Sequence, residues 1–207
     1  MDGESQSRIS PFSRGRLGAA LRLSISIDVE HGMDRRAKRT FALILLLILA
    51  CILIAPWTIP EGSAKELDGL VGRIDNESEW EDMNPFAHAV YWIGDMYCHQ
   101  MEARSFLMND NQLPVCARDL GIVLGMALGM AAFVRLRITM SPLHLILGLL
   151  PMALDGGLQL ITGYESMNPV RLITGGAAGL VVAMFMAMVF QETLRRREGE
   201  TGRHRRS

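Results

Sequence analysis

The sequence predicts an all-α, polytopic membrane helix bundle with about four transmembrane helices and one interfacial amphipathic helix. Residues 41–59 carry no charged side chain, and residues 120–190 carry only five of the chain's 21 basic and 22 acidic groups. This segregation excludes a simple soluble domain and a disordered chain, because neither keeps charges out of such long apolar stretches. The acidic and basic groups nearly cancel, so the composition also does not suit a nucleic-acid-binding protein.

The first predicted span covers residues 41–59, which is long enough to cross a hydrocarbon core of about 30 Å. Trp57 and Pro60 mark its end, at the depth where interfacial aromatic residues usually lie. Signal-peptide cleavage, or a lipid anchor at Cys51, is the competing interpretation. It is disfavoured because 40 residues precede the span and apolar residues continue past Cys51. A start at Met33 instead of Met1 leaves the span unchanged.

Three more spans are expected at about residues 120–134, 142–163 and 171–190. Residues 85–100 also lean apolar, but His88, Asp95 and His99 make them a poor lipid-facing span. We expect an interfacial amphipathic helix there. The chain then divides into a basic tail (1–40), the first span (41–59), an acidic segment (60–84), a membrane domain (85–190) and a second basic tail (191–207).

The distribution of Lys and Arg predicts the orientation. With four crossings, sixteen basic residues fall on one side of the membrane and five on the other. By the positive-inside rule, both termini are cytoplasmic, and the protein is a multi-pass protein of the cytoplasmic membrane. The acidic segment is then extracytoplasmic. The basic tails are expected mainly to set this topology, and they also favour contact with anionic lipids.

Small residues recur every four positions in two of the spans. Gly121, Gly125 and Gly129 form such a stripe in the second span, and Gly175 and Gly179 form one in the fourth. This pattern is typical of helices whose backbones approach closely. A broken helix that lines a substrate site is the alternative, and only Gly156-Gly157 in the third span suggests it.

Four polar residues are expected to meet near the outer ends of the spans: Arg118, Asp155, Gln159 and Arg171. A carboxylate inside a span costs about 2.5–3.5 kcal/mol, so Asp155 should face the bundle and pair with Arg118 or Arg171. Gln159 lies one helical turn from Asp155 on the same face. A structural ion pair and a role in binding or proton transfer both fit this pattern.

Two cysteines lie on the same predicted outer side. If residues 86–108 are helical, Asp95, Cys98, His99 and Glu102 share one face. Thiolate, imidazole and carboxylate are zinc ligands, so Cys98, His99, Cys116 and Asp119 are candidate ligands of a zinc-like divalent metal. The alternatives are a Cys98–Cys116 disulfide, which persists in an extracytoplasmic compartment, and two free thiols.

Ordered motif blocks between residues 86 and 190 carry a resemblance. They are Cys98-His99-Gln100, Arg104-Ser105-Phe106, Pro114-x-Cys116-Ala117-Arg118-x-x-Gly121, Asp155-Gly156-x-x-Gln159 and Asn168-x-x-Arg171-x-x-Thr174-Gly175. Together they resemble an uncharacterised prokaryotic family of predicted membrane proteins. In that family a Cys or another small residue typically follows the arginine that corresponds to Arg118. Asp119 stands there in this chain, so a ligand set with a third Cys would be altered. The resemblance implies a membrane protein and a site, but no reaction.

Three functional hypotheses follow from these residues. In the first, the Cys/His/Asp group is a metal or thiol site that acts on a membrane-delivered anionic substrate. Arg118 and Arg171 would hold the anion, Asp155 would serve as base or ligand, and Gln159 would orient it. In the second, the protein is a small transporter or channel component with Asp155 on the ion path. In the third, it is a structural scaffold stabilised by the disulfide.

Overall fold

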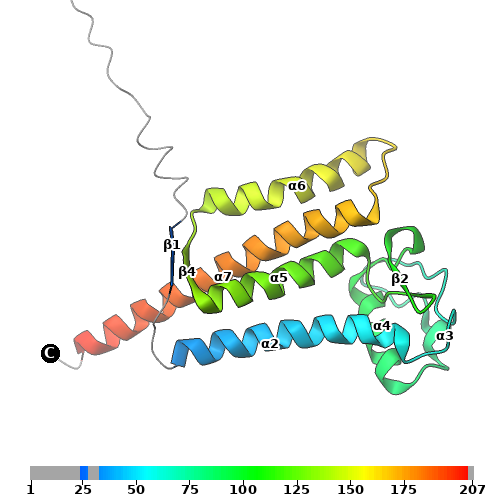
Figure 1. Cartoon of the computed structure of the whole chain (residues 1–207), viewed down its shortest axis with the longest axis horizontal. Helices are drawn as coiled ribbons and strands as arrows, with labels where there is room; N and C mark the ends of the chain where they lie inside the picture. The colour runs from blue at the N-terminus through cyan, green and yellow to red at the C-terminus, as the bar shows by residue number, and fades with distance from the viewer. Residues whose placement is uncertain (1–23, 28–32, 205–207) are drawn as a thin grey trace, which may run out of the picture.

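The computed structural model describes residues 24–27 and 33–204, and nearly all of its regular structure is helical (Figure 1). The bundle consists of four long helices: α2 (Met33–Ile54), α5 (Ala117–Arg135), α6 (Pro142–Ile161) and α7 (Asn168–His204). They lie side by side in the order α6, α7, α5, α2, and a cap of shorter elements stands at one end. Each long helix contains a segment apolar enough to cross a membrane. The predicted fold class is therefore confirmed.

The membrane-crossing segments lie close to the predicted ones, at Arg36–Trp57, Ala117–Arg135, Pro142–Ile161 and Asn168–Thr193. α6 is helical throughout, so the predicted alternative of a helix broken at Gly156-Gly157 is wrong. α7 continues to His204, so the segment predicted as a C-terminal tail begins as helix. Most of the predicted N-terminal tail (residues 1–23 and 28–32) and residues 205–207 lie outside the described residues.

The contact between α5 and α7 depends on the predicted glycine stripes. A Cβ atom at Gly121, Gly125 or Gly129 would lie 2.0–2.6 Å from a carbonyl oxygen of α7. In return, a Cβ at Gly175 or Gly179 would lie 2.4 or 2.1 Å from a carbonyl oxygen of α5. No side chain fits at such distances, so the two backbones are in direct contact. The predicted close packing of these helices is confirmed.

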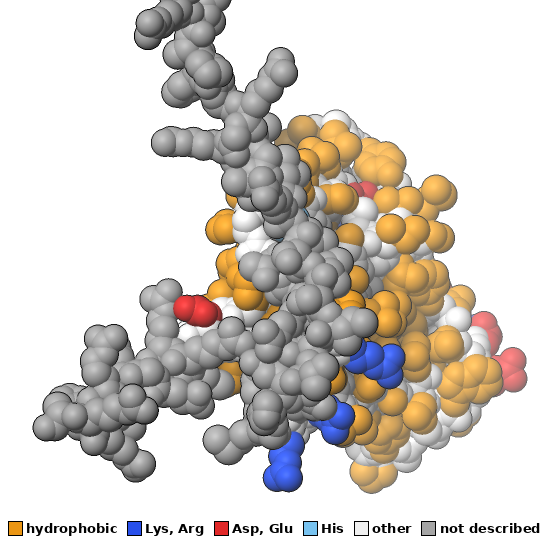
Figure 2. Space-filling model, turned by 60° about the vertical axis from the view of Figure 1, so that its left-hand side comes forward, with side chains coloured by type: hydrophobic (Ala, Val, Ile, Leu, Met, Phe, Trp, Pro, Cys, Tyr) orange, Lys and Arg blue, Asp and Glu red, His pale blue; other side chains and the backbone are white. Residues whose placement is uncertain are grey.

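The outer faces of α2 and α6 are apolar and exposed. The large exposed side chains include Leu43 and Leu47 of α2 and Leu150, Leu154 and Leu158 of α6. Apolar side chains also cover much of the surface in Figure 2. A helix with this much exposed apolar surface is suited to lipid rather than to water.

The cap (residues 55–116) contains η1 (Ala55–Trp57), α3 (Glu77–Trp80), α4 (Pro85–Tyr97), η2 (Glu102–Arg104), β2 (Leu107–Met108) and β3 (Asn111–Gln112). β2 and β3 pair antiparallel, with Leu107 opposite Gln112. At the other end of the bundle, β1 (Ser24–Ile27) pairs antiparallel with β4 (Leu136–Thr139). The apolar core of the cap includes Leu67, Trp80 and Tyr91. The acidic segment is thus an ordered part of the cap, because Leu67 and Trp80 anchor it.

Fully buried polar side chains hold the irregular segments of the cap together. The Asn111 side chain accepts from Ala64 N at 3.0 Å and donates to the carbonyls of Pro56 and Pro60 at 2.9 and 3.0 Å. Gln112 accepts from Leu67 N and donates to the carbonyls of Leu67 and Gln100. The side-chain amides thus take the place of backbone partners that a regular sheet or helix would provide.

α4 is amphipathic, as predicted. Its buried face includes Ala87, Tyr91 and Asp95 and packs inside the cap, whereas Ile93 and Tyr97 are exposed. Contact of this exposed face with the membrane surface stays a prediction.

Candidate functional site

Three of the predicted metal ligands lie together where the cap meets the bundle. Cys98 follows the last residue of α4, Cys116 is the N-cap of α5, and Asp119 lies in the first turn of α5. The two Sγ atoms and one carboxylate oxygen lie within 4.8 Å of one another. Within residues 24–27 and 33–204, this thiol–carboxylate group is the one cluster of three such ligands.

Short contacts fix the geometry of the thiol–carboxylate group. The backbone N–H of Cys116 donates to Cys98 Sγ at 3.1 Å, and the Cys116 thiol donates to Asp119 Oδ2 at 3.3 Å. Cys98 is only 3% exposed, so its sulfur faces the protein interior. Both cysteines are free thiols in the structure. The disulfide therefore stays a prediction.

The two thiols influence each other's ionisation. A hydrogen bond with Cys98 lowers the pKa of Cys116 despite the opposing effect of burial. The same hydrogen bond raises the pKa of Cys98, and burial and the nearby negative charges of Cys116 and Asp119 raise it further. The first proton thus leaves the pair more easily than it leaves an ordinary thiol, and the second leaves with more difficulty. A cation bound between the sulfur atoms would favour the loss of both protons.

His99, the fourth predicted ligand, is exposed and does not belong to the thiol–carboxylate group. The condition that residues 86–108 form one helix is not met, because α4 ends at Tyr97 and Cys98 is extended (φ −136°, ψ 149°). A Cβ at Gly94 would lie 1.9 Å from the Pro114 carbonyl oxygen, so a returning chain segment crosses α4 here. The chain turns at Gln100 (φ 44°), whose side chain donates to the Pro114 carbonyl at 2.8 Å.

Asp95, predicted to share a helix face with Cys98, lies elsewhere in the cap. Its carboxylate accepts from the backbone N–H groups of Asp75 and Asn76 at 2.8 and 3.3 Å. It also accepts from the Asn76 side chain at 2.9 Å, and it is fully buried. Asp95 therefore stabilises the loop at Asp75 and Asn76 within the acidic segment, and it is not part of the site.

An ion pair with a buried carboxylate joins α5 to α6, and its arginine lies in the same first turn of α5 as Asp119. Arg118 Nη2 lies 2.6 Å from Asp155 Oδ2, and the Gln159 side chain donates to the same oxygen at 3.3 Å. Asp155 is 7% exposed. The structure thus pairs Asp155 with one of the two arginines expected from the sequence and places Gln159 on the same carboxylate.

Arg171 connects this pair to α7. It is 2% exposed, and its two terminal nitrogens each lie 3.4 Å from an amide oxygen, one of Gln159 and one of Asn168. The Asn168 side chain donates to the Ser105 carbonyl at 2.9 Å, which fixes the cap to the start of α7. All four residues expected to meet at this level, Arg118, Asp155, Gln159 and Arg171, belong to one network.

Arg104 also faces this network, although the sequence reasoning did not select it. Its Nη2 atom lies 3.6 Å from Glu165 Oε1 in the loop between α6 and α7. The Arg104-Ser105-Phe106 motif is the sequence feature that points to Arg104. Its second residue, Ser105, accepts a hydrogen bond from the Asn168 side chain, which places this segment beside the start of α7. Composition and helical periodicity carry no such signal, since Arg104 lies in η2, a helix of only three residues.

Comparison with known proteins identifies the family. Residues 98–185 match the family described as "Predicted membrane protein (DUF2085)". The chain is also 36% identical over 120 residues to "Uncharacterized protein MJ1492" of Methanocaldococcus jannaschii, an alignment that covers 56% of this chain and 75% of the relative. The chain belongs to this family. No solved structure matches it.

The family match begins at Cys98 and ends within α7. It therefore includes the thiol–carboxylate group, the Arg118–Asp155 pair, Arg104 and Arg171. α2 and the first part of the cap precede it. The segment shared with other family members thus contains the whole candidate site, and the protein is a predicted membrane protein with four apolar helices.

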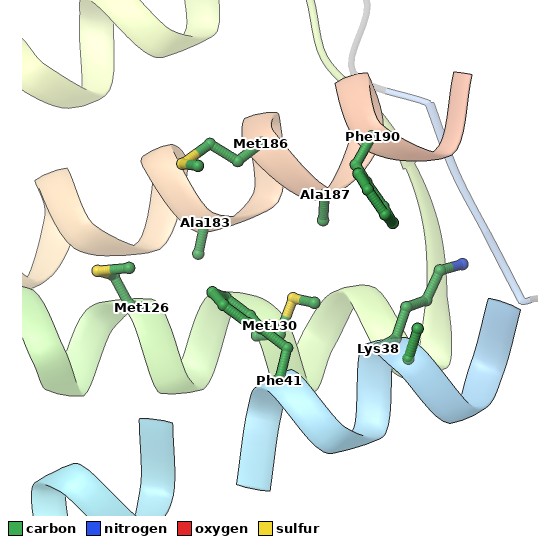
Figure 3. A pocket seen from close by; sticks show the side chains of 9 residues that line it. Lys38, Phe41, Met126, Met130, Ala183, Met186, Ala187 and Phe190 are labelled. Carbon is green, nitrogen blue, oxygen red and sulfur yellow. The ribbon is translucent and has the colours of Figure 1, made fainter. Parts of the chain in front are cut away.

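A second feature, an apolar cavity, lies toward the other end of the bundle (Figure 3). Its volume is about 320 Å³, and it lies between the start of α2, the second half of α5 and the middle of α7. Phe41, Met130 and Phe190 line it, and Ala183 and Ala187 leave the space open. Lys38 also lines it, and its amino group lies 5.0 Å from the Phe133 ring centroid and 3.3 Å from Gln191 Oε1.

Proposed function

We propose that Cys98, Cys116 and Asp119 bind a zinc-like divalent metal ion at the extracytoplasmic end of the bundle. The observation that carries this proposal is the convergence of their three ligand atoms within 4.8 Å. Two thiolates and a carboxylate are ligands that zinc accepts in proteins. Three protein ligands leave a fourth position open, which is the arrangement of catalytic rather than structural zinc sites.

The proposed substrate is an anionic molecule delivered through the membrane. Arg118 follows Cys116 by two residues on α5, so a guanidinium group lies in the same helical turn as two of the ligands. Arg171 approaches the same level from α7. A bound metal ion would supply a Lewis acid, and the two arginines would hold the negative charge of the substrate.

Asp155 takes a different role in this proposal from the base or ligand expected from the sequence. Its carboxylate is engaged by Arg118 at 2.6 Å and by Gln159 at 3.3 Å. We therefore assign Asp155 and Gln159 as positioning residues that fix the Arg118 guanidinium. His99 lies outside the ligand group, and we leave the fourth metal position to water or substrate.

The proposed orientation places the cap outside and both termini in the cytoplasm. Arg36, Arg39 and Arg135 are exposed at the end of the bundle away from the cap. Figure 2 shows basic side chains beside the apolar surface of the bundle. The acidic residues of the cap, such as Glu61, Glu79 and Asp82, lie at the other end. The basic end also supports contact with anionic lipids, at about 1 kcal/mol per Lys or Arg near the surface.

Metal analysis of the purified, full-length protein in detergent tests the metal site. We expect about one metal ion per chain in the wild type and less than a tenth of that in Cys98→Ser and Cys116→Ser, because each substitution removes a thiolate ligand. Cys51→Ser is the matched control, since Cys51 lies within α2 and outside the ligand group. It should keep the wild-type metal content.

Thiol alkylation distinguishes the competing disulfide. If the wild type contains no metal and Cys98 and Cys116 react with iodoacetamide in denaturant only after reduction, the metal proposal is wrong and the disulfide interpretation is correct. Full alkylation without a reductant, together with bound metal, supports the proposal.

A further inference from the structure

Among the described residues, the three guanidinium groups at this site form ion pairs with two carboxylates. Arg118 pairs with Asp155 at 2.6 Å, and Arg104 lies 3.6 Å from Glu165. Arg171 experiences the positive charges of Arg104 and Arg118 as well as the negative charges of these two carboxylates. Among the described residues the hydrogen-bond partners of the Arg171 guanidinium are neutral amide oxygens, so the three arginines and their two paired carboxylates have an excess of one positive charge.

Two donors in this cluster are buried without an acceptor among the described residues. They are the Nε atoms of Arg104 and Arg118. Buried donors are nearly always paired in folded proteins, so each exception needs an explanation. A water molecule would satisfy a donor but would leave the excess positive charge. An anion satisfies both requirements.

There is also open space beside these donors. A Cβ atom added at Gly156 would meet only Arg118 Nη1, at 3.7 Å, and one added at Gly157 would meet nothing within 4 Å. Neither glycine is therefore packed tightly against a neighbouring element. An oxyanion of small size has room to approach the Arg118 guanidinium from this side.

We propose that Arg104, Arg118 and Arg171 bind a phosphate-class oxyanion, either inorganic phosphate or the phosphate of a lipid headgroup. Arginine suits this ligand because its planar fork of N–H donors matches the oxygens of phosphate. The inference rests on the proposed function, since it names the chemical class of the anionic group that lies beside the metal ligands. It adds Arg104, which is not one of the arginines expected from the sequence.

Binding measurements on the full-length protein test the inference with two probes. Isothermal titration with inorganic phosphate detects the free ion. The same titration of the protein in detergent with a short-chain phosphatidic acid detects a lipid phosphate, and the corresponding diacylglycerol, which has no phosphate, is the control ligand. We expect at least one of the two probes to bind the wild type, and Arg104→Gln to weaken that binding at least tenfold. The probe that binds identifies the source of the phosphate.

Arg73→Gln is the matched control, because Arg73 also lies in the cap, is highly exposed and faces a carboxylate, that of Asp75. It should bind the probe as the wild type does. Arg104 is preferred to Arg118 for the test, since loss of Arg118 leaves Asp155 buried and unpaired. Arg104→Lys retains the charge but lacks the Nε donor, so we expect it to bind less well than the wild type.

The inference is wrong if neither probe binds the wild type, or if Arg104→Gln and Arg73→Gln bind the probe equally well. Its failure is distinguishable from that of the metal proposal. Protein that contains metal but binds neither phosphate probe refutes this inference alone. Protein that contains no metal but binds phosphate through Arg104 refutes the metal proposal alone.

Discussion

The bundle and the cap are stabilised by opposite means. In the bundle, glycines let the backbones of α5 and α7 touch, and a Cβ at Gly125 would lie only 2.0 Å from the Gly176 carbonyl oxygen. In the cap, the buried side-chain amides of Asn111 and Gln112 form hydrogen bonds with backbone groups that have no partner in a helix or sheet. Lipid offers no hydrophobic force between helices, so close packing must replace it. The cap has short irregular segments, so it needs polar side chains to satisfy its backbone.

The candidate site lies where these two regions join. The first turn of α5 supplies Cys116, Arg118 and Asp119, and the cap supplies Cys98 and Arg104. The Gly175 position of α7 lies against the Arg118 carbonyl, so close packing fixes the backbone from which the guanidinium extends. The site therefore depends on both regions. Substitutions in the bundle and substitutions in the cap should destabilise the protein to different extents.

The largest effect is expected from Gly125→Ala in the bundle. The added methyl group would overlap the Gly176 carbonyl oxygen, which belongs to backbone and cannot rotate away. We expect a loss of at least about 3 kcal/mol in the free energy of unfolding, at the upper end of the overpacking range. The loss is measured as a fall in the thermal midpoint in detergent.

Gly157→Ala is the control for this change. The Cβ of this variant would meet nothing within 4 Å, and Ala is the better helix former, so stability should be unchanged or slightly higher. Equal destabilisation by both substitutions would contradict the close contact of α5 and α7.

The next largest effect is expected at the buried ion pair. Arg118→Gln leaves the Asp155 carboxylate, which is only 7% exposed, without its cationic partner, at a cost of about 3 kcal/mol, because an unpaired buried charge is strongly destabilising. The double variant Arg118→Gln/Asp155→Asn removes both charges and should be less destabilised than the sum of the single variants. A double-mutant cycle in chemical denaturation measures this coupling.

Additive losses in that cycle would show that the two side chains act independently. The transport hypothesis makes a different prediction for Asp155. If Asp155→Asn keeps the stability of the wild type but abolishes an ion flux in liposomes, Asp155 is part of a transport path rather than a positioning residue.

A smaller effect is expected from Asn111→Leu in the cap. Leucine has a similar size but cannot pair with Ala64 N or with the carbonyls of Pro56 and Pro60. Each buried group left without a partner costs about 1–3 kcal/mol, although solvent entering the cap would recover part of it, so we expect a net loss of about 2 kcal/mol.

The loss should be local to the cap. Amide hydrogen exchange should accelerate in residues 55–116 and remain slow in α5 and α7. Asp82→Leu, a substitution at an exposed cap residue, is the control and should leave exchange unchanged. Faster exchange throughout the bundle would mean that the two regions unfold as one unit.

The bundle could be predicted from sequence because its signals are local and periodic. Uncharged runs gave the four helices, and the four-residue spacing of Gly121, Gly125 and Gly129 gave the contact between α5 and α7. The depth of Asp155 in its span required a cationic partner, and Arg118 was one of the two candidates. These inferences need only helix geometry and the cost of burying charge.

The cap could not be predicted in the same way, because its structure depends on contacts between distant irregular segments. α4 ends at Tyr97 since a returning segment crosses it at Gly94, and nothing within residues 86–108 indicates that crossing. For this reason His99 was expected beside Cys98 in the ligand group but is exposed. Asp95 was expected on the same face, yet it holds the loop at Asp75 and Asn76.

The smallest effect is expected at the surface of the cap, from Lys65→Met. Lys65 forms an exposed ion pair with Asp110, and the hydrogen bond to that carboxylate raises the pKa of Lys65 above 10.5. A raised pKa stabilises the fold at pH values below 10.5, and the contribution is lost as the pH rises through the folded-state value. Because the pair is exposed, Lys65→Met should lower the thermal midpoint only slightly at pH 8, and the difference should vanish in 1 M NaCl. Lys65→Arg keeps the pair and should match the wild type. A large loss that persists in high salt would mean that the aliphatic part of Lys65, rather than its charge, supports the cap, and that the cap depends on apolar packing more than its buried amides imply.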